Sequence, residues 1–390
     1  MDGNLNQDVL SRRAAYVECE QALDGFARRS SVLTVPNKWP FEARPGGAAA
    51  GAQLAVSWAR SNNPATLQLA SDEAPEDAAR SLLHRTYGLV ATVFADRIIG
   101  RDGRRDVTGG MLKLAVARLR ELYSGDLDQI IHGGVIALLS VDHIELDGPN
   151  PLLYQPISGA VRGDFQGVVN RALGRLINRQ RLRLEEVETD IIAGLLKELF
   201  SNTHVHARTD LTGAFYRRSA RGILFALRPV DTPHDSHAGG LTALREYYAS
   251  MADASARPRV EFLEISVFDS GPGLAARALG KPVKEAMPIN QEYDLVRGCF
   301  LKNFTTQNDP SHGLGLPRVM QALKACGGFM RLRTGRLSLC KWFPPRTQNI
   351  QFSPDDALFI DAGGDAEIKS YAPVTGASFS ILIPMGLGSR

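Results

Sequence analysis

The sequence predicts an α/β protein with two domains of different organisation. In the first 150 residues, short runs rich in β-branched residues alternate with stretches in which apolar residues recur at helical spacing. Two prolines and a glycine at 147–151 then interrupt this pattern. The chain has 390 residues, 44% of them hydrophobic, whereas a single core rarely grows beyond roughly 250–300 residues. We therefore expect a domain boundary near residue 150.

The first domain is expected to contain a sheet and several helices. Apolar residues at near-helical spacing predict helices at 7–29, 47–61, 75–86 and 110–122. Apolar runs rich in β-forming residues predict strands at 32–35, 66–70, 89–94 and 135–141. Such alternation is typical of a mostly parallel sheet covered by helices. The sequence of this domain has no GxGxxG or Walker motif, which leaves its role open between a sensor and a partner-binding domain.

After the break, a helical connector precedes the second domain. The predicted parts are a first domain at 1–150, a connector at 151–188 and a second domain at 189–390. The connector helix, at 167–187, carries Arg171, Arg175 and Arg179 four residues apart, which places them on one face. This face is either solvated or docks an acidic partner or nucleic acid. The net charge of +3, with both signs mixed along the chain, does not itself indicate nucleic acid.

Cysteine spacing and the distribution of apolar residues indicate the cellular compartment of the protein. The four cysteines are widely spaced and form no CxxC pair, so neither a zinc site nor a disulfide framework is indicated: Cys19, Cys299, Cys326 and Cys340. A polar stretch follows Met1, unlike a secretory signal. No uncharged apolar run reaches the ~18 residues that a membrane-spanning helix needs. We expect a cytoplasmic protein without a membrane anchor.

Three motifs in the second domain carry candidate chemistry. A helix predicted at 189–207 places Glu198, Asn202 and His206 on one face, because they are four residues apart. A carboxylate there can orient or deprotonate an attacking water. An amide oxygen one turn later is a ligand that Mg²⁺ accepts while it keeps several waters. His204 lies on a different side of the predicted helix and is expected to point elsewhere.

The other two motifs are rich in glycine. One follows a strand-like run at 262–268, and the other precedes an apparent helix: Asp269-Ser270-Gly271-Pro272-Gly273 and His312-Gly313-Leu314-Gly315-Leu316. Glycines permit sharp turns and close approach of the backbone to a ligand. Unpaired N–H groups at the start of a helix can hold a polyphosphate.

In order and character, the three motifs resemble the N box, first glycine box and second glycine box of the GHKL ATPases. This superfamily includes gyrase, Hsp90, MutL and the histidine kinases. The resemblance extends over residues 185–384. It implies a Bergerat-type α/β sandwich for 189–390, with a mixed, mostly antiparallel sheet and helices on one face. It also implies ATP and Mg²⁺ as cofactors.

The resemblance assigns a role to each motif residue. Glu198 is the implied catalytic base, Asn202 the metal ligand, and His206 the basic group that approaches the phosphates. Asp269 would accept a hydrogen bond from the exocyclic amine of adenine. The remaining implied nucleotide-binding residues are those of the two glycine boxes: Gly271, Gly273, His312, Gly313, Leu314, Gly315 and Leu316.

The segment between the two glycine boxes corresponds to the mobile ATP lid of the family. It offers four cations for the γ-phosphate, among which the sequence does not choose: Lys281, Lys284, Arg297 and Lys302. Where the family often has Gly-Thr, this chain has Gly376-Ala377, and Ser378 replaces the missing hydroxyl only if the register shifts. Polar insertions are expected at 230–258 and 341–372. His143 is a loose match to a kinase phosphoacceptor histidine.

Three functions remain open from the sequence. The first is a Mg-ATP-binding protein that hydrolyses ATP slowly as a conformational switch coupled to residues 1–150. The second is a protein kinase that transfers the γ-phosphate to a partner, and the third is a non-catalytic ATP sensor or scaffold. Expected partners are a protein or signalling ligand bound by residues 1–150, and a second copy of the chain in a nucleotide-dependent homodimer.

Overall fold

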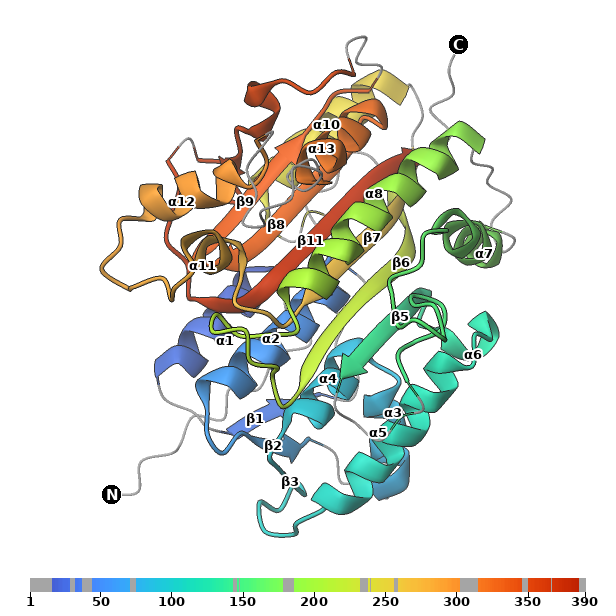
Figure 1. The fold of residues 1–390 in the computed structure, drawn as a ribbon, viewed down its shortest axis with the longest axis vertical. Helices are drawn as coiled ribbons and strands as arrows, with labels where there is room; N and C mark the ends of the chain where they lie inside the picture. The colour runs from blue at the N-terminus through green and yellow to red at the C-terminus, as the bar shows by residue number, and fades with distance from the viewer. Residues whose placement is uncertain are drawn as a thin grey trace.

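The structure is a computed structural model of the chain. It describes residues 16–28, 32–36, 44–70, 75–142, 146, 148–177, 186–231, 238, 240–255, 259–301, 315–345, 350–365 and 367–385. Within these ranges the protein is a mixed α/β fold built on an eight-stranded antiparallel sheet and a three-stranded parallel sheet (Figure 1). None of the helices in these ranges is long and apolar enough to cross a lipid bilayer.

The large sheet has the order β10-β9-β8-β11-β7-β6-β5-β4, and every neighbouring pair is antiparallel. Its strands are β4 (Ile131–His132), β5 (Val135–Asp142), β6 (Ser219–Asp231), β7 (Arg259–Asp269), β8 (Phe329–Gly335), β9 (Leu337–Trp342), β10 (Ile360–Asp361) and β11 (Val374–Met385). The predicted strand at 135–141 is therefore confirmed, and it pairs with β6 beyond the predicted break. That break near residue 150 falls between two neighbouring strands of one sheet.

Helices cover both faces of this sheet. Helix α8 (Glu186–His206) packs on one face against β6 and β7 and lies in front of the sheet in Figure 1. On the other face, the N–H of Gly46, just before α2 (Gly47–Ser61), donates to Glu264 of β7 over 2.7 Å. Tyr247 of α10 (Thr242–Ser255) packs against Phe262 on that same face of β7. The expectation of helices on one face for 189–390 is thus wrong, because α10 packs on the second face, which N-terminal helices also cover.

The side chains of β7 explain why helices pack on both faces of the large sheet. From Val260 to Asp269 every residue except Glu261 is buried. A strand buried on both faces has a nearly continuous apolar sequence rather than an alternating one. Helix α1 (Tyr16–Arg28) completes the second cover, where Glu20 pairs with Arg331 and Arg333 of β8.

The parallel sheet, β1 (Val32–Val35), β2 (Thr66–Leu69) and β3 (Arg97–Ile99), lies in the N-terminal part. Its companion helices are α2, α3 (Pro75–Leu83), α4 (Thr86–Phe94), α5 (Thr108–Tyr123) and α6 (Leu127–Ile130). The predicted strand at 89–94 is wrong, because these residues belong to α4. All nine residues of α4 are buried, and a short, fully apolar run does not distinguish a buried strand from a buried helix.

The remaining helices follow β5 in the chain. They are α7 (Gln166–Ile177), α11 (Leu274–Leu279), α12 (Ile289–Gly298), α13 (Gly315–Ala325) and the 3-10 helix η2 (Pro354–Ala357). Helix α10 lies inside the segment 230–258, which the sequence predicts as a polar insertion. Helix α13 packs against α8, and Gly315, the first described residue of the second glycine motif, lies beside Glu198.

Candidate functional site

Helix α8 orients the first group of candidate residues. Its inner face is anchored in the core by Ile192, Leu196 and Phe200, all fully buried. Glu198 and Asn202 lie one turn apart and are partly exposed, as is expected for side chains that point away from the core contacts. The structure confirms the predicted helix and brings both polar groups to one side of it.

Gly315, the first residue of α13, lies directly against these two side chains. A Cβ atom at Gly315 would be 3.0 Å from Oε2 of Glu198, and 3.6 and 3.8 Å from the amide atoms of Asn202. Gly315 of the second glycine motif is therefore a neighbour of Glu198 and Asn202 of the N-box-like motif, although the two motifs are far apart in the sequence. The described part of α13 begins at Gly315, beside the carboxylate and the amide.

Arg318, which was not predicted from the sequence, adds a third polar side chain to the cluster of Glu198 and Asn202. Its Nη1 donates to Oε1 of Glu198 over 2.9 Å. The arginine side chain is 60% exposed and that of Glu198 26%, so solvent screens this pair and it contributes little to stability. A sequence signal existed: Arg318 lies three residues after Gly315, one turn further along the predicted helix.

Asp269 ends β7 in a buried position. Its Oδ1 accepts hydrogen bonds from the N–H groups of Gly271 (2.9 Å) and Ala377 (3.3 Å). Burial raises the pKa of this carboxyl to about 6, although the two N–H donors and the charge of Arg277 act in the opposite direction. Asp269 therefore changes its protonation near pH 6, within reach of physiological conditions.

The first glycine motif packs against the end of α8. A Cβ at Gly271 would lie 2.7 Å from Cα of Ala207 and 3.1 Å from the carbonyl oxygen of His206. Such close approach is possible only for glycine. The turn after β7 and the C-terminal end of α8 thus lie in direct contact, which brings the motif of Asp269 to the motif of Glu198.

Arg277 of α11 holds this contact together, and it too was not anticipated. Its guanidinium donates to the carbonyl oxygens of His206 (2.8 Å), Thr209 and Asp210 (2.9 Å). These carbonyls lie at and just after the C-terminus of α8, where a cation also interacts favourably with the helix dipole. Arg277 therefore fixes the segment that follows His206 against the first glycine motif.

A threonine from a neighbouring strand provides the hydroxyl that position 377 lacks. Oγ1 of Thr334, in β8, donates to the carbonyl of Gly376 over 3.2 Å and accepts from the N–H of Leu274 over 3.1 Å. Ser378 pairs with Phe268 and lies on the other face of the sheet from Ala377. In this register the Ser378 side chain is on the opposite face from Ala377 and Asp269, and its replacement of the missing hydroxyl stays a prediction.

The two histidines of α8 differ as expected. Nδ1 of His204 lies 3.3 Å from the hydroxyl of Tyr154, and the two rings are in contact. Burial and the charges of Arg221 and Arg208 lower the pKa of His204 to about 4. The prediction that His204 points elsewhere is confirmed. His206, the last residue of α8, is partly buried one turn after Asn202.

Several predicted residues lie outside the described part of the chain. They are His312, Gly313 and Leu314 of the second glycine motif, Lys302 of the lid, His143 and Arg179. Leu316 is described, and its side chain is buried in the core. Gly273 is described with a φ of 89° at the start of α11. In the described residues no group of three or more His, Cys, Asp or Glu side chains gathers that could hold a metal ion by itself.

A cleft of about 890 Å³ opens beside the first glycine motif. It is lined by Pro272 and Gly273, and by Glu292, Arg336 and Tyr371 on its far side. Glu198, Asn202 and Gly315 do not line it. The cleft is large enough for a nucleotide-sized ligand. However, none of its described lining residues belongs to the cluster of Glu198, Asn202 and Arg318.

No protein-family model, curated protein or solved structure matches the chain. A functional assignment therefore depends on the geometry of the site and on the resemblance of its motifs.

Proposed function

We propose that the chain binds Mg-ATP between α8, the turn after β7 and the start of α13, and hydrolyses it slowly as a conformational switch. The observation that carries this proposal is the position of Gly315 against Glu198 and Asn202. A helix N-terminus that begins beside a carboxylate and an amide offers three groups of use to a bound nucleotide. Backbone N–H groups bind phosphate oxygens, the amide oxygen binds Mg²⁺, and the carboxylate positions water.

The arrangement of the elements supports a Bergerat-type fold as part of this proposal. Antiparallel strands β6, β7, β11 and β8 carry α8 and α13 on one face, and the nucleotide site lies at the end of β7. The N-terminal helices on the opposite face, with β4 and β5 at the sheet edge, are additions to that core.

Asp269 is the proposed adenine-reading residue. A carboxylate at the end of a buried strand can accept a hydrogen bond from the exocyclic amine, and guanine presents a carbonyl oxygen at the same ring position. The two N–H donors on Oδ1 hold the carboxyl in one orientation. Because its pKa is about 6, the acceptor form predominates at pH 7 and above.

The N-terminal part reaches this site through α2. Gln53 Nε2 donates to the carbonyls of Arg333 (3.0 Å) and Thr375 (3.4 Å), and the N–H of Thr375 donates to Oγ of Ser57 (2.9 Å). Thr375 directly precedes Gly376, which packs on the backbone of Asp269. Helix α2 therefore contacts the strand that contacts the proposed adenine site, and we propose this path as the coupling between nucleotide and N-terminal partner.

A non-catalytic ATP sensor is the second candidate, and the ion pair of Glu198 with Arg318 favours it. A carboxylate paired with a guanidinium is a weaker base, because the positive charge stabilises its ionised form. In this case ATP binds without turnover, or turnover begins only when a partner moves Arg318. We place either activity in the cytoplasm, with a protein partner for the N-terminal part and nucleotide-dependent pairing of two chains.

The experiment uses γ-labelled Mg-ATP and separates free phosphate from label on protein. The wild type is compared with Glu198→Gln and with Glu246→Gln, an exposed control on α10. Free phosphate that is lost in Glu198→Gln and kept in the control supports the hydrolytic switch. Label on protein shows a kinase instead. Binding without either product favours the sensor, and equal phosphate release by all three proteins removes Glu198 as the base.

A further inference from the structure

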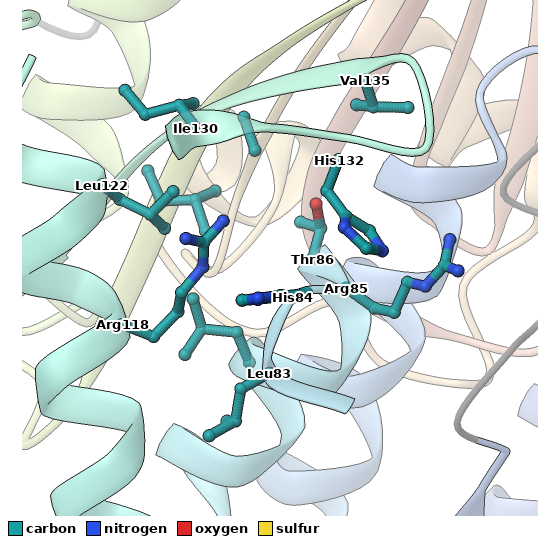
Figure 2. Close-up of a pocket in the computed structure, with 12 residues that line it drawn as sticks. Leu83, His84, Arg85, Thr86, Arg118, Leu122, Ile130, His132 and Val135 are labelled. Carbon is teal, nitrogen blue, oxygen red and sulfur yellow. The ribbon is translucent and has the colours of Figure 1, made fainter. Parts of the chain in front are cut away.

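A small pocket lies where α4 begins, against α5 and the hairpin of β4 and β5. It shares no residue with the proposed nucleotide site. Figure 2 shows four basic side chains around it: His84, Arg85, Arg118 and His132. Its volume of about 20 Å³ exceeds the ~10–15 Å³ that one water needs. The pocket therefore admits one small polar group, with basic side chains around it.

The N-terminus of α4 opens on this pocket without a cap. The residue at the N-cap position is Arg85, and no side chain caps the helix there. The first N–H groups of a helix have no partner within the helix, and all nine residues of α4, from Thr86 onward, are buried. Arginine offers no acceptor to these donors. A buried, uncapped helix start carries a partial positive charge that favours an anion.

Arg118 of α5 provides a second, independent observation. Its side chain is only 7% exposed. Nη1 donates to Oε2 of Glu121 over 2.7 Å and to the carbonyl of Gln129 over 3.1 Å. Its Nε is buried and makes no hydrogen bond within the described residues. A buried charged group with an unused donor is costly, and an acceptor in the pocket would satisfy it.

The pKa values of His84 and His132 depend on the charges around the pocket. Their ring centroids are 5.2 Å apart. Burial lowers the pKa of His132 to about 4, and the charges of Arg85, His84 and Arg118 contribute in the same direction. Burial and Arg118 likewise lower the pKa of His84, against the opposing charge of Glu121. Arg85 and Arg118 therefore act as positive charges on both rings, and Glu121 acts as a negative charge on His84.

We propose that this pocket binds the oxyanion group, carboxylate or phosphate, of a small ligand. The donors are the N–H and hydroxyl of Thr86, Nε of Arg118 and the ring nitrogens of His84 and His132. The volume admits one oxygen of such a group, and the rest of the ligand extends toward His84, an exposed residue of the lining. The proposal is independent of ATP binding at α8.

Titration calorimetry with sodium sulfate and, separately, sodium acetate tests the proposal at constant ionic strength. Sulfate stays fully ionised, so any pH dependence belongs to the protein. The wild type is compared with Arg118→Gln, with His132→Gln at the rim, and with Arg120→Gln, an exposed neighbour on α5. We expect saturable binding that weakens at least tenfold in Arg118→Gln and several-fold in His132→Gln, with no change in the control.

Binding should also take up protons. A bound anion raises the pKa of both histidines from their lowered values. The charges of Arg85 and Arg118 oppose this rise, and the charge of Glu121 adds to it. Anion affinity should therefore rise as pH falls from 7.5 to 5.5. Tighter binding of sulfate than of acetate assigns a phosphate-like ligand, and the reverse order assigns a carboxylate. The proposal is overturned if neither anion binds, or if binding is equal in all four proteins. Because Arg118→Gln can impair folding, unchanged affinity in a folded His132→Gln also counts against it.

Discussion

The guanidinium of Arg318 donates to the carboxylate of Glu198 over 2.9 Å, and this carboxylate lies beside Gly315 at the start of the described part of α13. This pair joins the helix that carries the proposed base to the helix that would hold the phosphates. A cation three residues into α13 is also close enough to the helix start to contact a phosphate once the pair opens. In the proposed nucleotide complex, Arg318 would therefore have two alternative partners, Glu198 and a phosphate of the nucleotide.

Replacing Arg318 with Gln should weaken nucleotide binding without loss of fold. We expect the KM for ATP, or its Kd where turnover is absent, to rise roughly tenfold, which corresponds to about 1.4 kcal/mol. The free energy of unfolding should change by less than about 1 kcal/mol, because the pair is partly exposed and screened. Urea unfolding and ATP titration of Arg318→Gln beside Arg120→Gln check both expectations. An unchanged ATP affinity removes Arg318 from the site.

Gly376→Ala should destabilise the protein strongly. Gly376 has a φ of 75°, and a Cβ there would lie 2.0 Å from the carbonyl oxygen of Asp269. Gly134→Ala is the matched control, since Gly134 has a φ of 82° with open space around its Cβ position. The control should cost about 1–2 kcal/mol for the left-handed backbone alone. Gly376→Ala should cost more than about 3 kcal/mol in urea unfolding, and equal costs would contradict the contact.

Loss of Arg277 should loosen the end of α8. Arg277→Ala removes the charge-assisted bonds to three backbone carbonyls, and we expect a loss of about 2–3 kcal/mol in the free energy of unfolding. Arg277→Lys keeps the charge but not the planar set of donors, so it should fall between wild type and Ala. Amide exchange should accelerate at residues 203–207 in both variants. Exchange that stays at the wild-type rate there would show that Arg277 does not hold this segment.

Protonation of Asp269 should control nucleotide binding. With a pKa of about 6, the carboxylate is ionised at pH 7.5 and largely protonated at pH 5, where it no longer serves as a full acceptor for the adenine amine. ATP affinity should therefore fall as pH falls through 6. Asp269→Asn should bind ATP more weakly at pH 7.5 and lose this pH dependence. Identical pH profiles for the two proteins would exclude Asp269 as the adenine contact.

The same raised pKa predicts how stability depends on pH. The folded pKa of about 6 lies above the ordinary value of 3.8 for an aspartate, so between these two pH values the folded state binds more protons than the unfolded state. Stability relative to Asp269→Asn should therefore decrease as pH rises from 4 to 6, by about 3 kcal/mol at most. Urea unfolding of both proteins across this range measures the difference. An increase over the same interval would contradict the buried position of the carboxyl.

Local patterns predicted some elements closely, and tertiary contacts explain the misses. Helix α2 has the predicted bounds 47–61, because its apolar and small residues recur over a length typical of helices. The run at 89–94 is helical because burial on all sides removed the periodicity that distinguishes helix from strand. Helices on both faces of the large sheet were not predicted, since the sequence does not show which segments cover β7.

The candidate site was predictable where its residues share one element. Helical spacing was enough to place Glu198 and Asn202 on one face of α8. Arg318 and Thr334 were missed because each belongs to an element whose position depends on the packing of the whole sheet. Gly315 was predicted from its motif alone, and only the structure brings it against Glu198.

Binding of Mg-ATP to the purified full chain tests the central claim most directly. Calorimetric titration with a non-hydrolysable ATP analogue and Mg²⁺ should show one saturable site per chain in the wild type. Asn202→Ala should weaken that binding at least tenfold, and the weakening should disappear when Mg²⁺ is replaced by EDTA. Absence of binding in the wild type, or equal affinity in Asn202→Ala with Mg²⁺ present, would contradict a Mg-ATP site at α8.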